Sequence, residues 1–229
     1  MTPLVLIPGM MCDARLYAPQ IAALNRRPVM VAPCTEGDSM AGLAAAVLAA
    51  APPRFALAGL SMGGIVAMEV VRQAPDRVER LCLMDTNAKA ESDAIRATRG
   101  PQVDRVMAGG LETVMRDEMM PAYLDPGADR PDIRDLCLDM ALALGPEVFA
   151  RQSQALATRP DQQATLAAWT GPALVLCGAA DRLCPLHRHE AMHALMPQSR
   201  LAVIAGAGHL PTLEQPEATT AEIRAWLDA

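Results

Sequence analysis

Residues 55–64 read Phe-Ala-Leu-Ala-Gly-Leu-Ser-Met-Gly-Gly and contain the most informative motif of the chain. The run Phe55–Ala58 is apolar, as in a buried strand, and Gly63–Gln73 has apolar side chains at helical spacing. Between them, Gly-Leu-Ser-Met-Gly is a Gly-x-Ser-x-Gly pattern at a sharp turn from strand to helix. Such a turn strains its central residue, so the residues two positions away must be small. The pattern predicts that the Ser61 hydroxyl stands at a helix N-terminus, where it can act as a nucleophile.

Short apolar runs recur along the chain and alternate with longer segments of helical period. The runs are Leu4–Ile7, Val29–Ala32, Phe55–Ala58, Leu81–Met84, Ala173–Cys177 and Leu201–Ile204. The helical segments are Arg15–Leu24, Met40–Ala50, Gly63–Gln73, His187–Leu195 and Ala218–Leu227. Strands that alternate with helices pair in parallel, because parallel neighbours need a crossover connection. We therefore predict an α/β fold with a mostly parallel sheet of about six strands, flanked by helices on both faces.

Residues 90–168 break this alternation. They contain no convincing strand, only helical stretches separated by Gly-Pro, Gly-Gly and Pro-Gly pairs. We predict a small helical cap at 90–168, with the core formed by residues 1–89 and 169–229. Five of the 15 methionines fall in this insertion: Met107, Met115, Met119, Met120 and Met140. They either fill gaps between small helices or form an adaptable wall for an apolar ligand.

The composition excludes several classes of protein. A chain of 229 residues that is 52% hydrophobic is too apolar to be disordered, and no apolar stretch in it is long enough to span a membrane. The net charge of −6 argues against a general binder of nucleic acid or of anionic membranes. Because the N-terminal residues lack a basic leader and a cleavage site, we expect a cytoplasmic protein whose six dispersed cysteines are reduced.

A serine nucleophile needs a histidine base and an acid that orients the base. His209 lies in a glycine-containing loop after the last predicted strand, and Asp181 follows the strand before it. Since the carboxyl ends of parallel strands share one edge of the sheet, Ser61, Asp181 and His209 are expected to meet there. Asp85 follows an earlier strand and is a rival acid, although it and the two residues after it are also typical of a helix-capping turn.

Two backbone amides complete the predicted site as an oxyanion hole. The amide of Met62 follows the serine at the helix N-terminus and points where an oxyanion would form. After the first strand, a glycine lets the chain turn so that a second amide faces Ser61. Met10 is the first choice for this second donor and Met11 the alternative. Met11 is also expected to line the substrate pocket.

These motifs resemble those of the α/β-hydrolase superfamily along nearly the full length of the chain. Four motifs carry the resemblance: the Gly59–Gly64 turn, Gly-Ala-Ala-Asp181-x-x-x-Pro185, Gly-x-Gly-His209 and the Leu213-Glu-Gln-Pro-Glu start of the last helix. The chain departs from the family pattern after the first strand, where it has Pro8-Gly9 and many members have His-Gly. Within the superfamily the chain looks like the carboxylesterases that act on acyl-carrier-protein methyl esters and the 3-oxoadipate enol-lactonases. The resemblance implies a helical cap over the carboxyl edge of the sheet.

The predicted reaction is hydrolysis of a small-molecule ester or lactone through an acyl-enzyme. His209 takes the Ser61 proton and Asp181 holds the imidazole, so no metal or organic cofactor is needed. The same three residues also fit a cofactor-free haloperoxidase or a carbon–carbon bond hydrolase, and a non-catalytic ligand-binding module is a further alternative. Arg151 and Arg159 of the predicted cap either hold a substrate carboxylate or belong to a solvated helix face.

A second motif, His189-Glu190-Ala-Met-His193, matches the His-Glu-x-x-His pattern of zinc hydrolases. It would present two imidazoles one helical turn apart. A third ligand would come from His187, Glu214 or His209. We assign the polar residues of this helix instead to a solvated outer face, because a zinc site would leave the Gly59–Gly64 turn unexplained.

Overall fold

The computed structural model describes all 229 residues. Its sheet has six strands, all parallel, in the order β2-β1-β3-β4-β5-β6. They are β1 (Leu4–Ile7), β2 (Val29–Val31), β3 (Phe55–Leu60), β4 (Val78–Met84), β5 (Ala173–Gly178) and β6 (Arg200–Ile204). Each strand overlaps one of the apolar runs in the sequence, so the predicted α/β fold with a parallel sheet is confirmed.

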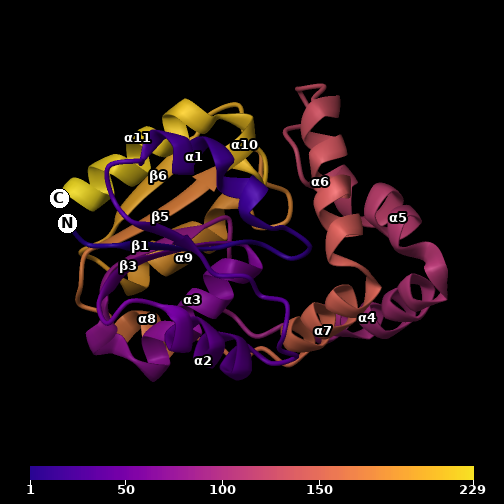
Figure 1. The fold of residues 1–229 in the computed structure, drawn as a ribbon, viewed down its shortest axis with the longest axis horizontal. Coiled ribbons are helices and arrows are strands. Elements are labelled where there is room, and N and C mark those ends of the chain that lie inside the picture. Colours follow the sequence, from indigo (N-terminus) through magenta and orange to yellow (C-terminus); the bar gives the residue numbers. More distant parts are fainter.

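Helices cover both faces of the sheet (Figure 1). One face carries α1 (Ala18–Ala23), α10 (Pro211–Glu214) and α11 (Pro216–Asp228), and the other carries α2 (Met40–Ala50), α3 (Met62–Gln73), α8 (Gln163–Ala168) and α9 (Leu186–Leu195). Because both faces are covered, β1, β3 and β5 are buried along their whole length. This burial explains why these strands are continuous apolar runs rather than alternating patterns.

The chain between β4 and β5 contains helices and no strand. These are α4 (Asp93–Arg105), α5 (Leu111–Val114), α6 (Pro131–Leu144) and α7 (Pro146–Ala157), followed by α8, which packs on α3 and α9. Figure 1 shows α4 to α7 together at one end of the sheet, opposite the two chain termini. The structure agrees with the predicted lack of strands in residues 90–168, and a role of that segment as a cap stays a prediction.

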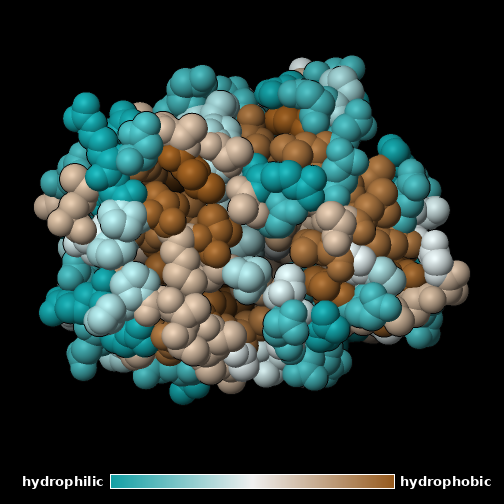
Figure 2. Space-filling model, viewed as in Figure 1, coloured by the Kyte–Doolittle hydropathy of each residue, from teal (hydrophilic) through white to brown (hydrophobic).

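The methionines of this helical segment fall into different environments. Met115, Met120 and Met140 are buried among the helices, where they fill space. Met107 is 51% exposed, and Figure 2 shows hydrophobic surface over the helices of this segment on one face. Met119 lines a cavity described below. Gap filling therefore accounts for most of these side chains.

The cysteines are all buried and unpaired, in agreement with the expected reduced thiols. Burial raises the pKa of the Cys34 and Cys177 thiols to about 12, so both stay protonated at neutral pH and pack as small apolar groups. No helix of the chain has the length and apolar character that a membrane crossing needs.

Candidate functional site

Ser61 occupies the sharp turn between β3 and α3. Its backbone angles are φ 55° and ψ −118°, with the positive φ that most side chains avoid, a strain of about 1–3 kcal/mol. The Ser61 amide donates to the Met84 carbonyl at 2.9 Å, and the Ser61 carbonyl accepts from Thr86 Oγ1 at 2.7 Å. Two contacts with the end of β4 thus hold the strained residue in place.

Glycine is required on both sides of Ser61 because backbone segments approach closely there. A Cβ on Gly59 would lie 2.2 Å from the Gly63 carbonyl oxygen, and a Cβ on Gly63 would lie 2.0 Å from the Ile7 carbonyl oxygen. Neither position can hold a side chain unless the backbone moves. The Gly-x-Ser-x-Gly pattern is therefore set by the packing of this turn against its own helix and against β1.

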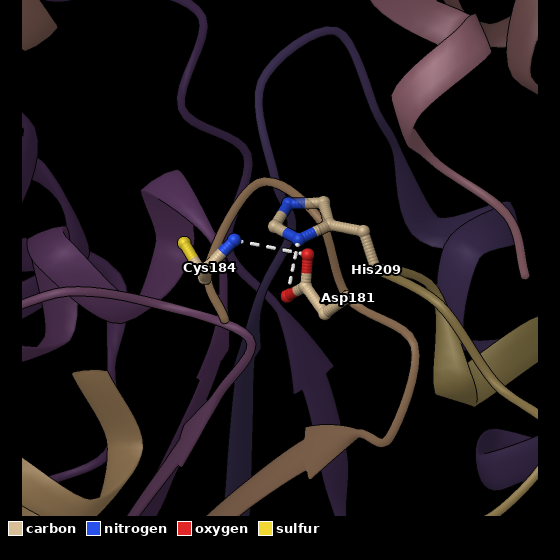
Figure 3. Close-up of side chains that lie close together, drawn as sticks. All are labelled: Asp181, Cys184 and His209. Carbon is tan, nitrogen blue, oxygen red and sulfur yellow. Dashed lines mark hydrogen bonds and ion pairs between the residues drawn. The ribbon is translucent and has the colours of Figure 1, made fainter. Parts of the chain in front are cut away.

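His209 and Asp181 are joined by a hydrogen bond between buried side chains. His209 Nδ1 lies 2.9 Å from Asp181 Oδ2, while Asp181 Oδ1 accepts from the Leu183 and Cys184 amides at 2.8 and 2.9 Å (Figure 3). Burial alone would raise the pKa of Asp181, but its interaction with His209 and the two amide hydrogen bonds lower this pKa to about 2. Asp181 is therefore ionised at neutral pH and holds the Nδ1 edge of the imidazole.

Glu214 fixes the loop that carries His209. Its Oε2 accepts from the amides of both neighbours of His209, at 2.9 and 3.1 Å, and its Oε1 accepts from the Asp125 amide at 2.7 Å. The amide of His209 itself donates to the Tyr123 carbonyl at 2.7 Å. The loop after β6 is therefore tied both to α10 and to the helical segment, a role for Glu214 that sequence reasoning missed.

Asp85, the rival acid, forms no hydrogen bond with His209. It is fully buried at the end of β4, and one carboxyl oxygen accepts from a β5 amide at 2.9 Å. Burial, and after it the nearby Asp181, raise the pKa of Asp85 well above its usual range, so its surroundings disfavour the charged carboxylate. The helix-capping alternative for Asp85 is wrong, since the next helix, α4, is capped by the hydroxyl of Ser92.

A cavity of about 210 Å³, here termed the serine cavity, brings the predicted site residues together. Ser61, His209, Met10 and Met62 all line it, although no hydrogen bond joins the Ser61 and His209 side chains. Apolar residues of the helical segment also line it: Ile95, Met119, Tyr123 and Leu156. Met11 does not, so its predicted place in the substrate pocket finds no support in this cavity.

Gln152 of α7 connects the helical segment to the turn after β1. It is 1% exposed, its Oε1 accepts from the Met11 amide at 2.8 Å, and its Nε2 donates to the Cys34 carbonyl at 2.8 Å. The amides of Met10 and Met62, in contrast, have no acceptor within the protein. Sequence reasoning missed Gln152, although a polar residue on the apolar face of α7 was the available signal.

The His-Glu-x-x-His motif does not form a metal site. His187 and Glu190 are exposed, as the solvated face predicts, but His189 is fully buried, so the assignment to that face is wrong for this residue. The Nε2 of His189 accepts from the Thr86 amide at 3.1 Å. His193 Nδ1 instead lies 2.7 Å from Ser199 Oγ, so the two histidines have different partners. The one group of three potential ligands within 4.8 Å of one another lies elsewhere: Asp181, Cys184 and His209.

Comparison with known proteins gives relatives over nearly the whole chain. The family model described as "Alpha/beta hydrolase family" matches residues 4–223. A pimeloyl-[acyl-carrier protein] methyl ester esterase from Edwardsiella ictaluri is 29% identical, covering 93% of this chain and 88% of that protein. A thermophilic esterase from Thermogutta terrifontis, solved with malate bound, has a TM-score of 0.90 at 31% identity, covering 100% of this chain and 90% of that one.

Some relatives are more distant in sequence, and others are longer than this chain. The enol-lactonase from Burkholderia xenovorans LB400 has a TM-score of 0.89 at 21% identity, covering 100% of this chain and 92% of that one, and so shares the fold. Other curated relatives are about twice as long as the matched region: the chain spans 45% of two of them and 56% of a third.

Acid should weaken the fold through His189. Burial lowers the pKa of His189 to about 4, so the folded protein resists a proton that the unfolded chain accepts below about pH 6.5. This stabilisation is complete above about pH 6.5 and is lost toward pH 4. Between pH 7 and pH 5 this loss lowers the free energy of unfolding by about 2 kcal/mol. In His189→Gln, an amide oxygen can replace the acceptor for Thr86 without titrating.

Urea unfolding of both proteins at pH 7 and pH 5 measures the effect. The free energy of unfolding should fall more steeply with acid in the wild type than in His189→Gln. Equal pH dependence in the two proteins would contradict the role assigned to His189.

Proposed function

The chain belongs to the α/β hydrolase family, and we propose that it is a serine hydrolase that cleaves a carboxylic ester or lactone through an acyl-enzyme. One observation carries the proposal: a serine on a strained turn and a histidine bonded to a buried, ionised aspartate line the same cavity. Strain at a non-glycine residue persists only where the surroundings enforce it, and it is concentrated at functional sites. Ser61 is the proposed nucleophile.

In the proposed mechanism His209 moves the protons. Its Nε2 takes the proton of Ser61 Oγ as this oxygen attacks the carbonyl carbon, and then delivers that proton to the leaving alcohol oxygen. Asp181 keeps the other ring proton on Nδ1 and stabilises the imidazolium. In the second half of the reaction His209 takes a proton from a water molecule as the water oxygen attacks the acyl carbon. His209 then returns this proton to Ser61 Oγ as the bond between the acyl carbon and Ser61 breaks and the acid leaves.

The amides of Met62 and Met10 are the proposed donors to the oxyanion. Both residues line the serine cavity and neither amide has an acceptor within the protein, whereas the Met11 amide is bonded to Gln152. The Met62 amide also lies at the N-terminus of α3, where the helix dipole favours negative charge. By analogy with side-chain donors, each amide would contribute about 2.7–4 kcal/mol to transition-state stabilisation.

Residues 90–168 are the proposed cap of this site. Ile95, Met119, Tyr123 and Leu156 of this segment line the serine cavity together with Ser61, and Gln152 ties the segment to the turn that carries Met10. Gln152 touches no reacting atom in this proposal. It is a positioning residue that holds the Met11 amide, so that the preceding amide of Met10 stays directed at the cavity.

Relatives favour ester hydrolysis over the other reactions that a Ser-Asp-His set can perform. The Edwardsiella relative is named as a methyl ester esterase and the Thermogutta relative as an esterase. The malate bound to the second of these is compatible with a carboxylate-bearing ligand. A non-catalytic module would have no use for both a strained serine and two residues with acceptor-free amides in the lining of one cavity.

Loss of the Ser61 hydroxyl should abolish ester turnover. Ser61→Ala should lower kcat for p-nitrophenyl acetate and butyrate by about three orders of magnitude or more, because the nucleophile is gone while the oxyanion donors remain. Ser39→Ala, which changes a serine outside the serine cavity, is the matched control and should keep the wild-type rate. Unchanged turnover in Ser61→Ala would overturn the assignment of the nucleophile.

Gln152→Ala should lower kcat by about tenfold with little change in KM, because an oxyanion donor acts in the transition state. The variant also leaves the buried Met11 amide without an acceptor, at a cost of about 1–3 kcal/mol in stability. Gln154→Ala changes an exposed glutamine of the same helix and is the control. If Gln152→Ala lowers the free energy of unfolding but leaves kcat unchanged, Gln152 has a purely structural role.

A further inference from the structure

A second cavity, of about 260 Å³, adjoins the serine cavity. The two share four lining residues: Asn87, Ile95, Arg159 and Arg188. The second cavity is also lined by Lys89 and His187 and by no acidic residue, and it is termed the basic cavity here. Two guanidinium groups therefore lie in the wall common to both cavities.

The serine cavity itself has an excess of positive charge. Arg99, Arg159 and Arg188 line it, against Glu91 as the one lining carboxylate, which leaves a net charge of +2. The surplus is local, because the chain as a whole carries a net charge of −6. A cavity wall of this sign in an acidic protein favours an anionic ligand.

Most of this charge is already paired within the protein, with one exception. Glu91 is buried and bonded to Arg99 Nη2 at 2.7 Å and to Arg159 Nη1 at 3.1 Å, and Arg159 Nε donates to the Lys89 carbonyl at 3.1 Å. Arg188, half-buried on α9, has no ion pair or side-chain hydrogen bond within the protein. A guanidinium on a half-buried residue that has no protein acceptor is free to bind an anion.

Arg151, the other arginine that the sequence offered for a carboxylate, is excluded by its position. It donates to the Thr35 carbonyl at 2.8 Å and lines neither cavity. Arg99 is held against Glu91 as an internal ion pair. The donors that remain for an anion are the guanidinium of Arg188 and those N–H groups of Arg159 that are not bonded to Glu91 or to the Lys89 carbonyl.

We propose that the substrate carries a carboxylate that binds Arg188 and Arg159 while its ester or lactone carbonyl lies at Ser61. The proposal rests on the proposed function for the carbonyl end and adds a charge requirement at the other end. A planar carboxylate matches the fork of a guanidinium, and the partly buried setting strengthens the attraction. The substrate class is therefore the half-ester of a short dicarboxylic acid, or a lactone that bears a carboxylate.

The test compares esters that differ in one negative charge. Monomethyl and dimethyl esters of succinic, glutaric and adipic acids are assayed with the wild type, and kcat/KM should be about tenfold or more higher for at least one monoester than for its dimethyl partner. Arg188→Gln should lower this ratio by about tenfold or more. Because the Arg188 side chain makes no bond within the protein, the variant should fold, which thermal unfolding checks.

A second arm moves the carboxylate to the leaving alcohol. The acetate ester of glycolic acid is compared with methyl acetate, and a preference for the charged ester that Arg188→Gln removes would place the carboxylate on the alcohol side. Arg116→Gln is the control, since Arg116 pairs with Glu112 on the surface and lines neither cavity. It should leave the selectivity for charged esters unchanged.

The outcomes distinguish a failure of the carboxylate proposal from a failure of the proposed serine hydrolase activity. If the wild type hydrolyses p-nitrophenyl esters but shows no preference for charged esters in either arm, the carboxylate proposal is overturned and the serine hydrolase stands. The same holds if Arg188→Gln lowers kcat/KM equally for charged and neutral esters. If no ester is hydrolysed at all, the proposed function fails first.

Discussion

Close contact between backbone segments at the Ser61 turn determines the arrangement of the proposed site. Gly63 packs so tightly on the Ile7 carbonyl that a Cβ there would lie 2.0 Å from it. The same contact brings the chain just after β1, with the amide of Met10, beside the N-terminus of α3, with the amide of Met62. One packing requirement therefore explains the glycine, the strained serine and the pairing of two amides without acceptors. The strain, about 1–3 kcal/mol, is offset by the hydrogen bonds that Ser61 makes to the end of β4.

The buried titratable groups near this turn have pKa values that are shifted in different directions. Asp181 receives three hydrogen bonds and is ionised, whereas Asp85 receives one, and burial and the neighbouring Asp181 raise its pKa well above its usual range. His189, also buried, is neutral at pH 7 because burial lowers its pKa to about 4. Burial raises the pKa of Asp85, whereas His209 and two amides lower the pKa of Asp181, and the acid with the lowered pKa is the one bonded to His209.

The sequence was sufficient to predict the strands of the sheet, because strands that are buried on both faces are continuous apolar runs and differ clearly from the helical segments between them. The choice of Ser61, Asp181 and His209 rests on each following a strand at the same edge of the sheet. The structure bonds His209 to Asp181 and places Ser61 and His209 in the lining of one cavity, and their catalytic roles stay a prediction. The sequence could not show contacts between distant segments: the burial of His189 against the chain after β4, or the hold of Gln152 on the turn after β1. Nor could it show that Arg188 lies unpaired between two cavities, because that depends on how the helical segment packs on the core.

The central claim is that Ser61 is a nucleophile activated by His209. Incubation with a fluorophosphonate, followed by peptide mass spectrometry, tests it most directly, because the reagent is attacked only by an activated hydroxyl and leaves a covalent mark on it. One adduct per chain is expected, on Ser61, formed with loss of esterase activity, and labelling of His209→Ala should be much slower. An adduct on another residue, or full esterase activity in protein whose Ser61 stays unmodified, would contradict it.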